Sequence, residues 1–282
     1  MIARLGKLGL AAAVLAAALG LLPPTAVAKA RLQSACVALS QGPSPAPARV
    51  MQASFGDELA DDSLRIRYLA HASFALETAG GLLAVTDYTG LLGNPDIVPD
   101  VVTMNNAHDT HFTDHPDPRI PVVLRGWGPP GQPARIEVDL GEMLIRNVTT
   151  DLRGPFGEGG RQNGNSIFLF EVAGLCIGHL SHLHQVPSPA QYASIGRMDV
   201  VMVPVDGGFT MDLKTMAAVV RALHPRIVLP MHWFSDASLA AFLAEMQPDF
   251  ALQKLATAEV VVARASLPQR PTIIVLSPQL FP

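Results

Sequence analysis

Histidines that follow apolar runs are the feature of this chain that most limits its fold. The run Ile97–Met104 predicts a buried strand, and His108 and His111 follow it closely. Two more apolar runs end in the same way, at His179 and at His232. Because loops at strand ends are where a scaffold presents reactive groups, these three ends predict a metal site assembled from distant parts of the chain. The alternative is that these are scattered surface or core histidines.

Length and composition limit the classes of protein and partner. A chain of 282 residues is long enough for one large domain or two small ones with a substantial core. Only 16% of the residues are charged, the net charge is −4, and no cluster of basic residues occurs. This composition excludes a nucleic-acid partner of the usual basic kind, so we expect a small-molecule substrate.

The N-terminus has the pattern of a secretory signal peptide. Arg4 and Lys7 precede the apolar run Leu8–Leu22, and Ala26–Ala28 has the small-x-small pattern of a cleavage site. We therefore expect residues 1–28 to be a signal peptide, the mature protein to be periplasmic or secreted, and no stable membrane span to remain after cleavage. An uncleaved N-terminal anchor is the alternative.

Residues 29–62 are expected to be a Pro-rich, disordered lead-in to an ordered domain at residues 63–282. The two cysteines, Cys36 and Cys176, are too few for a disulfide framework. Cys176 lies in an apolar run and is expected to be a small buried hydrophobic residue. A Cys36–Cys176 disulfide and lipid attachment at Cys36 remain open alternatives.

The periodicity of apolar residues predicts a strand-rich first part and a mixed second part. Strands are expected at 64–69, 71–77, 82–86, 97–104, 120–125, 134–138, 143–148, 166–172, 175–178, 198–205, 225–231, 258–263 and 272–276. Helices are expected at 187–196, 211–223 and 236–246, and residues 151–164, with five glycines, are expected to form a long loop. This order predicts two packed sheets with helices outside them.

Five motifs in succession resemble the metallo-β-lactamase superfamily. The nearest likeness is the branch of ascorbate-6-phosphate lactonase-like and N-acylphosphatidylethanolamine phospholipase-like hydrolases. The motifs are Tyr68–Glu77, Leu83–Tyr88, Asn106–His111 at the H-x-H-x-D-H position, Gly178–His182 at the G-D-x-G-H position, and Val203–Gly208 with Pro230–His232. The resemblance implies an α/β fold, the four-layer αββα sandwich, with the site along one edge of the two sheets.

The departures from the family pattern affect the metal ligands. Asn106 replaces the first motif histidine, Thr110 replaces the motif aspartate, and His179 replaces the aspartate that bridges two metals in the family. No histidine occurs in 143–151, where the family has its middle histidine. Because a two-metal site needs a bridging carboxylate, the resemblance implies a remodelled site with a single metal.

The expected ligands of that metal are His111, His179 and His232, together with His108. Three neutral imidazoles and a water are a recognised zinc arrangement, so we expect one zinc ion rather than two. Manganese is the alternative metal, and a metal-free site is the other alternative. His108 or Asp109 would accept the proton in catalysis.

Five further residues are expected to support the site or line its pocket. These are His71, Asp87, Asn106, Thr110 and His182. For His71 the alternative is a hydrogen-bonded core histidine, and for Asp87 it is the cap of a strand end.

The function expected from these residues is that of a metal-dependent hydrolase. It would act on an ester, lactone or phosphodiester through a metal-bound hydroxide. The alternative is a non-catalytic exported protein of the same fold that binds a metal or ligand without turnover.

Overall fold

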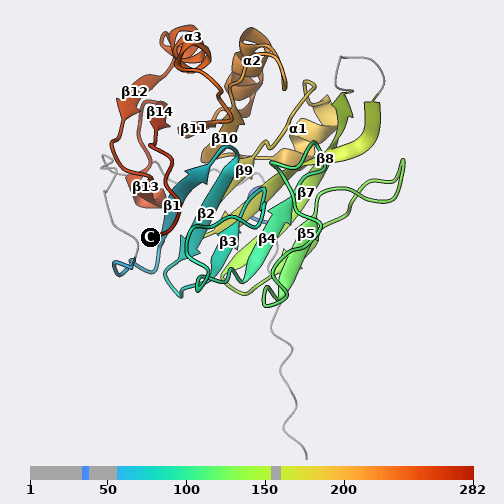
Figure 1. The fold of residues 1–282 in the computed structure, drawn as a ribbon. Helices are drawn as coiled ribbons and strands as arrows, with labels where there is room; N and C mark the ends of the chain where they lie inside the picture. The colour runs from blue at the N-terminus through green and yellow to red at the C-terminus, as the bar shows by residue number, and fades with distance from the viewer. Residues whose placement is uncertain (1–33, 38–55, 154–159) are drawn as a thin grey trace, which may run out of the picture. The chain divides into compact units, whose positions relative to one another are not determined.

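Two mixed β-sheets packed face to face form the centre of the protein (Figure 1). The computed structural model describes residues 34–37, 56–153 and 160–282, so the predicted signal peptide and most of the predicted lead-in lie outside the described residues. The first sheet has the order β13-β1-β2-β3-β4-β5, and the second has the order β12-β14-β11-β10-β9-β8-β7-β6.

The first sheet comprises β1 (Ser63–Ala70), β2 (Ser73–Thr78), β3 (Leu83–Val85), β4 (Val101–Met104), β5 (Val122–Arg125) and β13 (Glu259–Ala263). The second comprises β6 (Glu137–Asp139), β7 (Met143–Arg153), β8 (Gly160–Val172), β9 (Leu175–His179), β10 (Val200–Pro204), β11 (Ile227–Met231), β12 (Ala251–Lys254) and β14 (Thr272–Val275). The helices are α1 (Pro189–Ile195), α2 (Leu213–Leu223), α3 (Asp236–Met246) and the short 3₁₀ turn η1 (Arg264–Ser266).

The space between the sheets is filled by apolar side chains from both of them. Ile66 and Phe74 of the first sheet and Ile145, Phe170 and Met202 of the second are completely buried there. The strand pattern explains this burial, because alternate side chains of each strand point to the same face.

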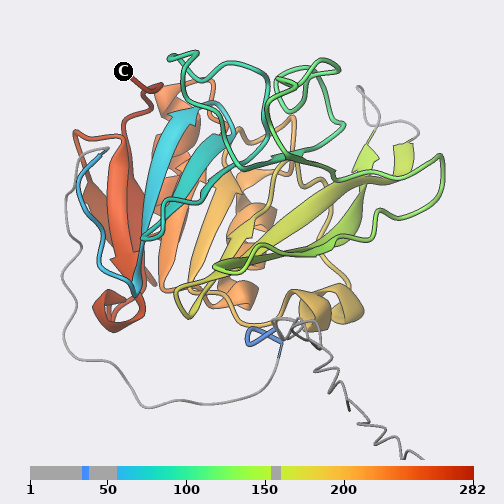
Figure 2. The ribbon, with the colours of Figure 1, turned by 90° about the horizontal axis from the view of Figure 1, so that it is seen from below.

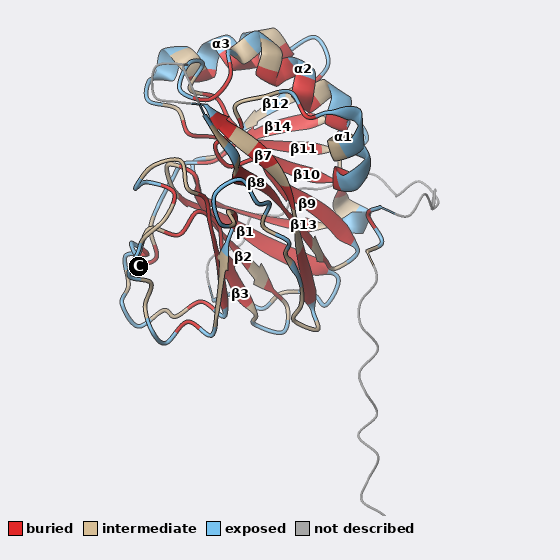
Figure 3. Ribbon diagram, turned by 90° about the vertical axis from the view of Figure 1, so that its right-hand side faces the viewer, coloured by how far each residue is buried: buried red, intermediate tan, exposed pale blue. Residues whose placement is uncertain are grey.

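The three helices cover the other face of the second sheet. Figure 3 shows the outward faces of α1, α2 and α3 exposed and the strands beneath them buried. In α2, Met216, Ala217 and Val220 recur at helical spacing and are fully buried, and the Asp212 side chain caps the helix by accepting the backbone N–H of Thr215. None of the helices in the described residues is long and apolar enough to cross a lipid bilayer.

Loops and the chain end cover the outer face of the first sheet. Tyr88, Leu92, Ile120 and Phe281 pack there with strand residues such as Val85. The predicted α/β sandwich is confirmed, with this outer layer built from loops in the described residues.

The topology brings several strand ends to one edge of the sandwich. Strands β3, β4 and β5 are parallel neighbours in the first sheet, and β9, β10 and β11 are parallel neighbours in the second. Parallel strands end at the same edge of a sheet, so the loops after β3, β4, β9, β10 and β11 are available to build one site.

The prediction of a long loop at 151–164 is wrong: the described residues on both sides of 154–159 belong to strands β7 and β8. Arg153 pairs with Gly160 and Leu152 with Arg161, so β7 and β8 continue through most of this stretch as an antiparallel hairpin. The stretch has few apolar residues because most of this extension lies at the surface, where cross-strand hydrogen bonds replace burial. Strand β12, at the edge of the second sheet, was also missed.

A disulfide joins Cys36 to Cys176 of β9 across a sequence separation of 140 residues. This finding corrects two expectations. Cys176 is buried but its sulfur is in a disulfide, and residues 34–37 of the predicted disordered lead-in are attached to the domain. The Cys36 carbonyl also accepts the backbone N–H of Arg197 at 2.9 Å, which places this segment beside the end of α1 (Figure 2).

Glu171 of β8 holds the same segment by charge-assisted hydrogen bonds. It accepts the Ser34 hydroxyl at 2.5 Å, the Ala35 backbone N–H at 2.8 Å and the Arg146 guanidinium at 2.8 Å. Burial by itself raises the pKa of Glu171, but these hydrogen bonds outweigh it and hold the pKa below its ordinary value. We name residues 34–37, with their disulfide and their bonds to Glu171, the N-terminal latch.

Removing the disulfide should lower stability. A crosslink over 140 residues restricts the unfolded chain strongly, so Cys36→Ala/Cys176→Ala should reduce the free energy of unfolding by about 3 kcal/mol. Urea denaturation with and without reductant measures this, and reductant should weaken the wild type but leave the double variant unchanged. A wild-type midpoint that does not move in reductant would contradict the prediction.

The contribution of Glu171 should depend on pH. Since its pKa is lowered by folding, its stabilisation is complete above the unfolded-state pKa and is lost as the pH falls through the folded-state value. Glu171→Gln should therefore cost about 1–2 kcal/mol at pH 7, and the difference from wild type should shrink as the pH falls below about 4.3, the ordinary pKa of a glutamate side chain. Urea titrations of both proteins from neutral to acidic pH test it, with Glu58→Gln as a control at an exposed carboxylate.

Candidate metal centre

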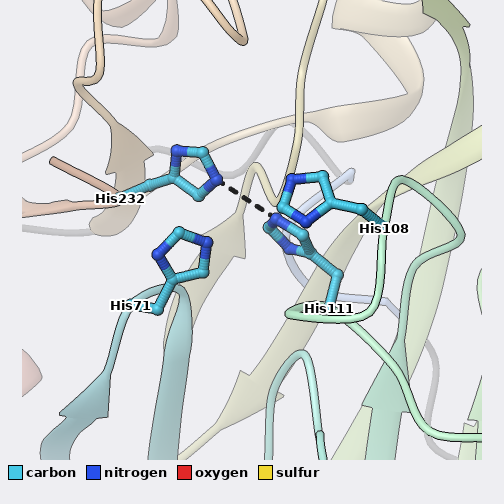
Figure 4. A group of neighbouring side chains, drawn as sticks. All are labelled: His71, His108, His111 and His232. Atoms are coloured by element: carbon cyan, nitrogen blue, oxygen red, sulfur yellow. Dashed lines mark hydrogen bonds between the residues drawn. The ribbon is translucent and has the colours of Figure 1, made fainter. Parts of the chain in front are cut away.

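Four histidines from three segments meet at the edge where the strands end. His71 lies in the turn between β1 and β2, His108 and His111 in the loop after β4, and His232 directly after β11. Each offers one ring nitrogen to a group in which all four atoms lie within 4.8 Å of one another. Figure 4 shows the four rings arranged around one common space.

Two buried carboxylates fix the tautomers of His111 and His232. The Nδ1 of His111 lies 2.6 Å from Asp87 Oδ2, and the Nδ1 of His232 lies 3.0 Å from Asp206 Oδ2. Because an ionised carboxylate only accepts hydrogen bonds, both Nδ1 atoms must donate, so a ring that carries one proton has its lone pair on Nε2. These Nε2 atoms face each other at 3.2 Å. Two lone pairs at that distance repel unless a proton or a cation lies with them.

His71 supplies a third imidazole, and its Nε2 atom has no hydrogen-bond partner among the described residues. This nitrogen is buried, and the centre of the His71 ring lies 4.1 Å from that of His232. Burial, with the neighbouring histidines His232, His111 and His108, lowers the pKa of His71 to about 3. The ring is therefore neutral at pH 7, and a metal ion would satisfy its orphaned nitrogen.

Unusual backbone angles accompany this arrangement. His71, Asp87, Ser181 and His232 have φ values of 48°, 42°, 49° and 58°, in the left-handed region that non-glycine residues seldom adopt. Each lies at the end of a strand that leads into the site. Such positions cost free energy that surrounding contacts must supply, and they cluster at functional sites in proteins.

Asp87 is the centre of a buried hydrogen-bond network. Besides His111, it accepts the Ser181 hydroxyl at 2.7 Å and the Asn105 amide at 3.1 Å. Burial raises the pKa of Asp87, but His111, His179 and Ser181 together lower it below its ordinary value, so the carboxylate stays ionised. The prediction of Asp87 as a supporting residue agrees with this position, whereas Asn105, which the sequence reasoning missed, takes the supporting role expected of Asn106.

Asp206 orients His232 as Asp87 orients His111, and this role was not predicted. It also accepts the backbone N–H groups of Gly208 and Thr210 at 2.8 and 2.9 Å and the Thr210 hydroxyl at 2.6 Å. Burial raises its pKa, but the bonds from His232 and Thr210 outweigh burial and lower the pKa well below its ordinary value. A signal existed in the sequence, since Asp206 follows the apolar run that ends at Val205, as His108 follows its own.

His108 differs from His111 and His232 because a hydroxyl, not a carboxylate, lies behind its ring and its Nε2 faces a fifth histidine. Its Nδ1 lies 2.8 Å from the Thr110 hydroxyl, and its Nε2 lies 3.1 Å from Nε2 of His182. Burial and the nearby His111 and His232 lower the pKa of His108 to about 4, so its ring is neutral at pH 7. The predicted supporting roles of Thr110 and His182 fit these contacts, and the buried His182 also contacts His184.

His179 does not join the group, contrary to the expectation from the sequence. Its Nε2 donates to the carbonyl oxygen of Ala72 at 2.7 Å, and its fully buried ring lies against Phe74 between the sheets. The reason is strand alternation: His179 is the last residue of β9, and its side chain points into the sandwich instead of out of the strand end. His71 occupies the place that we expected His179 to take.

Two other predicted residues lie outside the group. Asp109 is exposed at the surface of the loop, and Asn106 is half-buried in the same loop. The structure therefore brings His108, His111 and His232 together with His71, and leaves Asp109 and His179 away from them.

The donor set fits a zinc ion. All four members of the group are imidazoles, the ligand type that zinc accepts readily. Two nitrogens bound to one tetrahedral zinc lie about 3.3 Å apart, given zinc–nitrogen bonds of about 2.0–2.1 Å. The 3.2 Å between Nε2 of His111 and Nε2 of His232 matches that separation. The paired Asp87 and Asp206 have the positions of carboxylates that orient metal-bound histidines.

Comparison with known proteins gives the family of this chain. The family model described as beta-lactamase superfamily domain matches residues 65–232, more than half of the chain. A UPF0173 metal-dependent hydrolase of Carboxydothermus hydrogenoformans is 25% identical over 211 residues, which cover 65% of this chain and 91% of that protein. One of Methylocella silvestris is 25% identical over 221 residues, covering 65% and 92%.

Two solved structures have a fold similar to that of this chain. A crystal structure from Thermotoga maritima, assigned to the zinc-dependent hydrolases of the metallo-β-lactamase superfamily, has a TM-score of 0.56 and 25% identity, covering 77% of this chain and 100% of that one. A Parabacteroides distasonis structure shares the fold at a TM-score of 0.51 and 15% identity, covering 65% and 88%. The fold and the family model thus define a sandwich with its site at the shared strand edge. The chain belongs to the metallo-β-lactamase superfamily.

A matched pair of variants distinguishes the geometric assignment from the one based on sequence. Glutamine keeps a hydrogen-bonding amide but is a poor zinc ligand, so His71→Gln should lower zinc affinity at least about 100-fold, since the loss of a ligand should exceed that of a supporting contact. His179→Gln can still donate to Ala72 and should keep equimolar zinc. Zinc content and competition with a chelator measure both. Loss of zinc in His179→Gln with retention in His71→Gln would restore the assignment based on sequence.

Proposed function

We propose that this protein is a metal-dependent hydrolase that holds one zinc ion with His71, His111 and His232. The observation that carries the proposal is the pair of Nε2 lone pairs of His111 and His232 facing each other at 3.2 Å. Support also comes from relatives that are named metal-dependent hydrolases and match over most of their own length.

The ligand assignment follows from the contacts behind each ring. Nε2 of His71 has no partner, and carboxylates behind the rings hold Nε2 of His111 and Nε2 of His232 towards the site. His108 has a hydroxyl behind its ring, and its Nε2 faces His182. Three ligands leave a position for water or substrate, as catalytic zinc sites require, and four would close it. When bound, zinc would act as a Lewis acid and lower the pKa of a coordinated water to about 7.

The residues around the ion then have distinct tasks. Asp87 and Asp206 hold His111 and His232 in the tautomers that present Nε2. His108 is neutral at pH 7 and lies beside the three proposed ligands, so it can accept the proton that water releases. Hydrolysis of an ester or lactone breaks the acyl C–O bond, with hydroxide added to the acyl carbon and a proton delivered to the leaving oxygen. His108 is placed to return that proton.

The substrate class proposed is an ester, lactone or phosphodiester, and the proposed branch is that of the lactonase-like and phospholipase-like hydrolases. Support for the branch comes from the motifs at Tyr68–Glu77 and Asn106–His111. One observation favours the second candidate function, a protein that binds metal without turnover: the bridging aspartate of the family is replaced by His179, which is occupied with Ala72.

We further propose that the protein is exported to an oxidising compartment, periplasmic or extracellular, after cleavage of residues 1–28. The Cys36–Cys176 disulfide supports this proposal, because such bonds persist in oxidising compartments and are rare in reducing ones. Fractionation of cells that express the full chain, with sequencing of the mature N-terminus, tests the location.

Hydrolysis should require both zinc and His108. With zinc-loaded protein, 4-nitrophenyl acetate should be hydrolysed, and His108→Ala should lower kcat by about 10²–10⁴-fold while zinc stays bound. His224→Ala, which removes an exposed histidine at the end of α2, is the matched control and should match wild type. Equimolar zinc without turnover of any ester, lactone or phosphodiester would support the non-catalytic alternative.

A further inference from the structure

Two strongly exposed phenylalanines lie beside the four-histidine group. Phe209 and Phe234 are 65% and 59% exposed, and their rings meet edge to face with centroids 5.2 Å apart. The Phe234 ring also contacts two of the histidines, with centroids 5.2 Å from His232 and 5.5 Å from His71. The aromatic surface therefore runs without a break from two proposed zinc ligands to the outside of the protein.

The loop that carries Phe209 is held firmly in this position. The Asp206 carboxylate binds the N–H groups of Gly208 and Thr210, and the Arg153 guanidinium donates to the carbonyls of Gly208, Phe209 and Thr210 at 2.6, 3.1 and 2.9 Å. Asp206 also orients His232, so one carboxylate connects the loop to a proposed ligand. The exposure of Phe209 is thus a built feature of the loop.

Exposed aromatic rings on a rigid loop are costly to leave in water and usually mark a binding site. Most other large apolar side chains of the described residues are buried in the three cores. We call the exposed rings of Phe209 and Phe234 the platform. It continues outward from the four-histidine group, and part of a substrate would lie on it.

We propose that Phe209 and Phe234 bind the apolar chain of the substrate, so that the protein prefers esters or lactones with an alkyl or acyl chain over charged, compact substrates. This inference rests on the proposed function and narrows its substrate class. A chain lying across both rings starts next to His71 and His232, so the scissile group reaches the ion while the chain covers the platform. Arg153, a cation at this edge, donates from one terminal nitrogen to three carbonyls of the loop that carries Phe209.

The test compares 4-nitrophenyl esters with chains of two, four, six and eight carbons on zinc-loaded full-length protein. Burial of each methylene on the platform should raise kcat/KM by about two- to fourfold. Phe209→Ala should flatten this dependence, and Phe209→Leu, which keeps an apolar surface, should restore much of it. Leu252→Ala removes an exposed apolar side chain from the edge strand β12 and should keep the wild-type dependence.

Binding of inert ligands separates failure of this inference from failure of the proposed function. Methyl alkyl ketones with the same chains cannot be hydrolysed, and calorimetry should show affinity that rises with chain length in wild type and less in Phe209→Ala. If no ester is turned over but this dependence holds, the platform stands and the hydrolase proposal fails. If the affinity for the ketones does not depend on chain length, or depends on it equally in wild type and Phe209→Ala, the platform proposal is overturned. Binding to neutral phosphatidylcholine vesicles that requires Phe209, without any dependence on chain length, would overturn it in favour of a membrane surface.

Discussion

The facing nitrogens of His111 and His232 are the interaction on which the candidate site depends. Each ring would gain by turning its Nε2 towards a hydrogen-bond donor, yet the two Nε2 atoms are held 3.2 Å apart, which is repulsive when neither of them carries a proton. Asp87 and Asp206 enforce this, since each fixes Nδ1 as a donor from the far side of its ring. This arrangement is repulsive without a cation and becomes favourable once a cation lies between the two nitrogens. The protein therefore holds these two ligands in the binding geometry before an ion binds.

The sandwich supplies the rigidity that such an arrangement needs. Asp87 follows β3, Asp206 follows β10, and His232 follows β11, so each residue leaves a strand that is buried and hydrogen-bonded on both sides. The positive φ angles of Asp87 and His232 are tolerated because these strands leave little freedom to relax. At the opposite end of β9, the N-terminal latch fixes Cys176 and so ties this strand to a segment that precedes the domain in sequence.

The sequence was sufficient for the sheets and for the general position of the site, because apolar runs that end in polar residues predict buried strands and exposed strand ends. It failed where the direction of one side chain decides the role. His71 and His179 both lie at strand ends, and only the three-dimensional register shows that His179 donates to Ala72 between the sheets while the ring of His71 faces the other three histidines. The β7–β8 extension was missed for a related reason, because its stability comes from pairing that composition does not reveal. The disulfide could not be chosen over a free thiol, since two cysteines say nothing of their distance.

Charge balance favours the proposed single ion over two ions. In the superfamily pattern, carboxylates at the positions of Thr110 and His179 bind the metals directly; here both positions are neutral, and the Thr110 hydroxyl contacts His108 instead. The negative charge that remains, on Asp87 and Asp206, lies behind the ligands and is buried. Two buried carboxylates together neutralise a single dication, whereas a second dication would leave an excess positive charge in a region shielded from water, which is strongly unfavourable. The replacement of direct carboxylate ligands by carboxylates behind histidines would thus keep the site neutral with one dication, and it keeps the imidazoles oriented towards the common space.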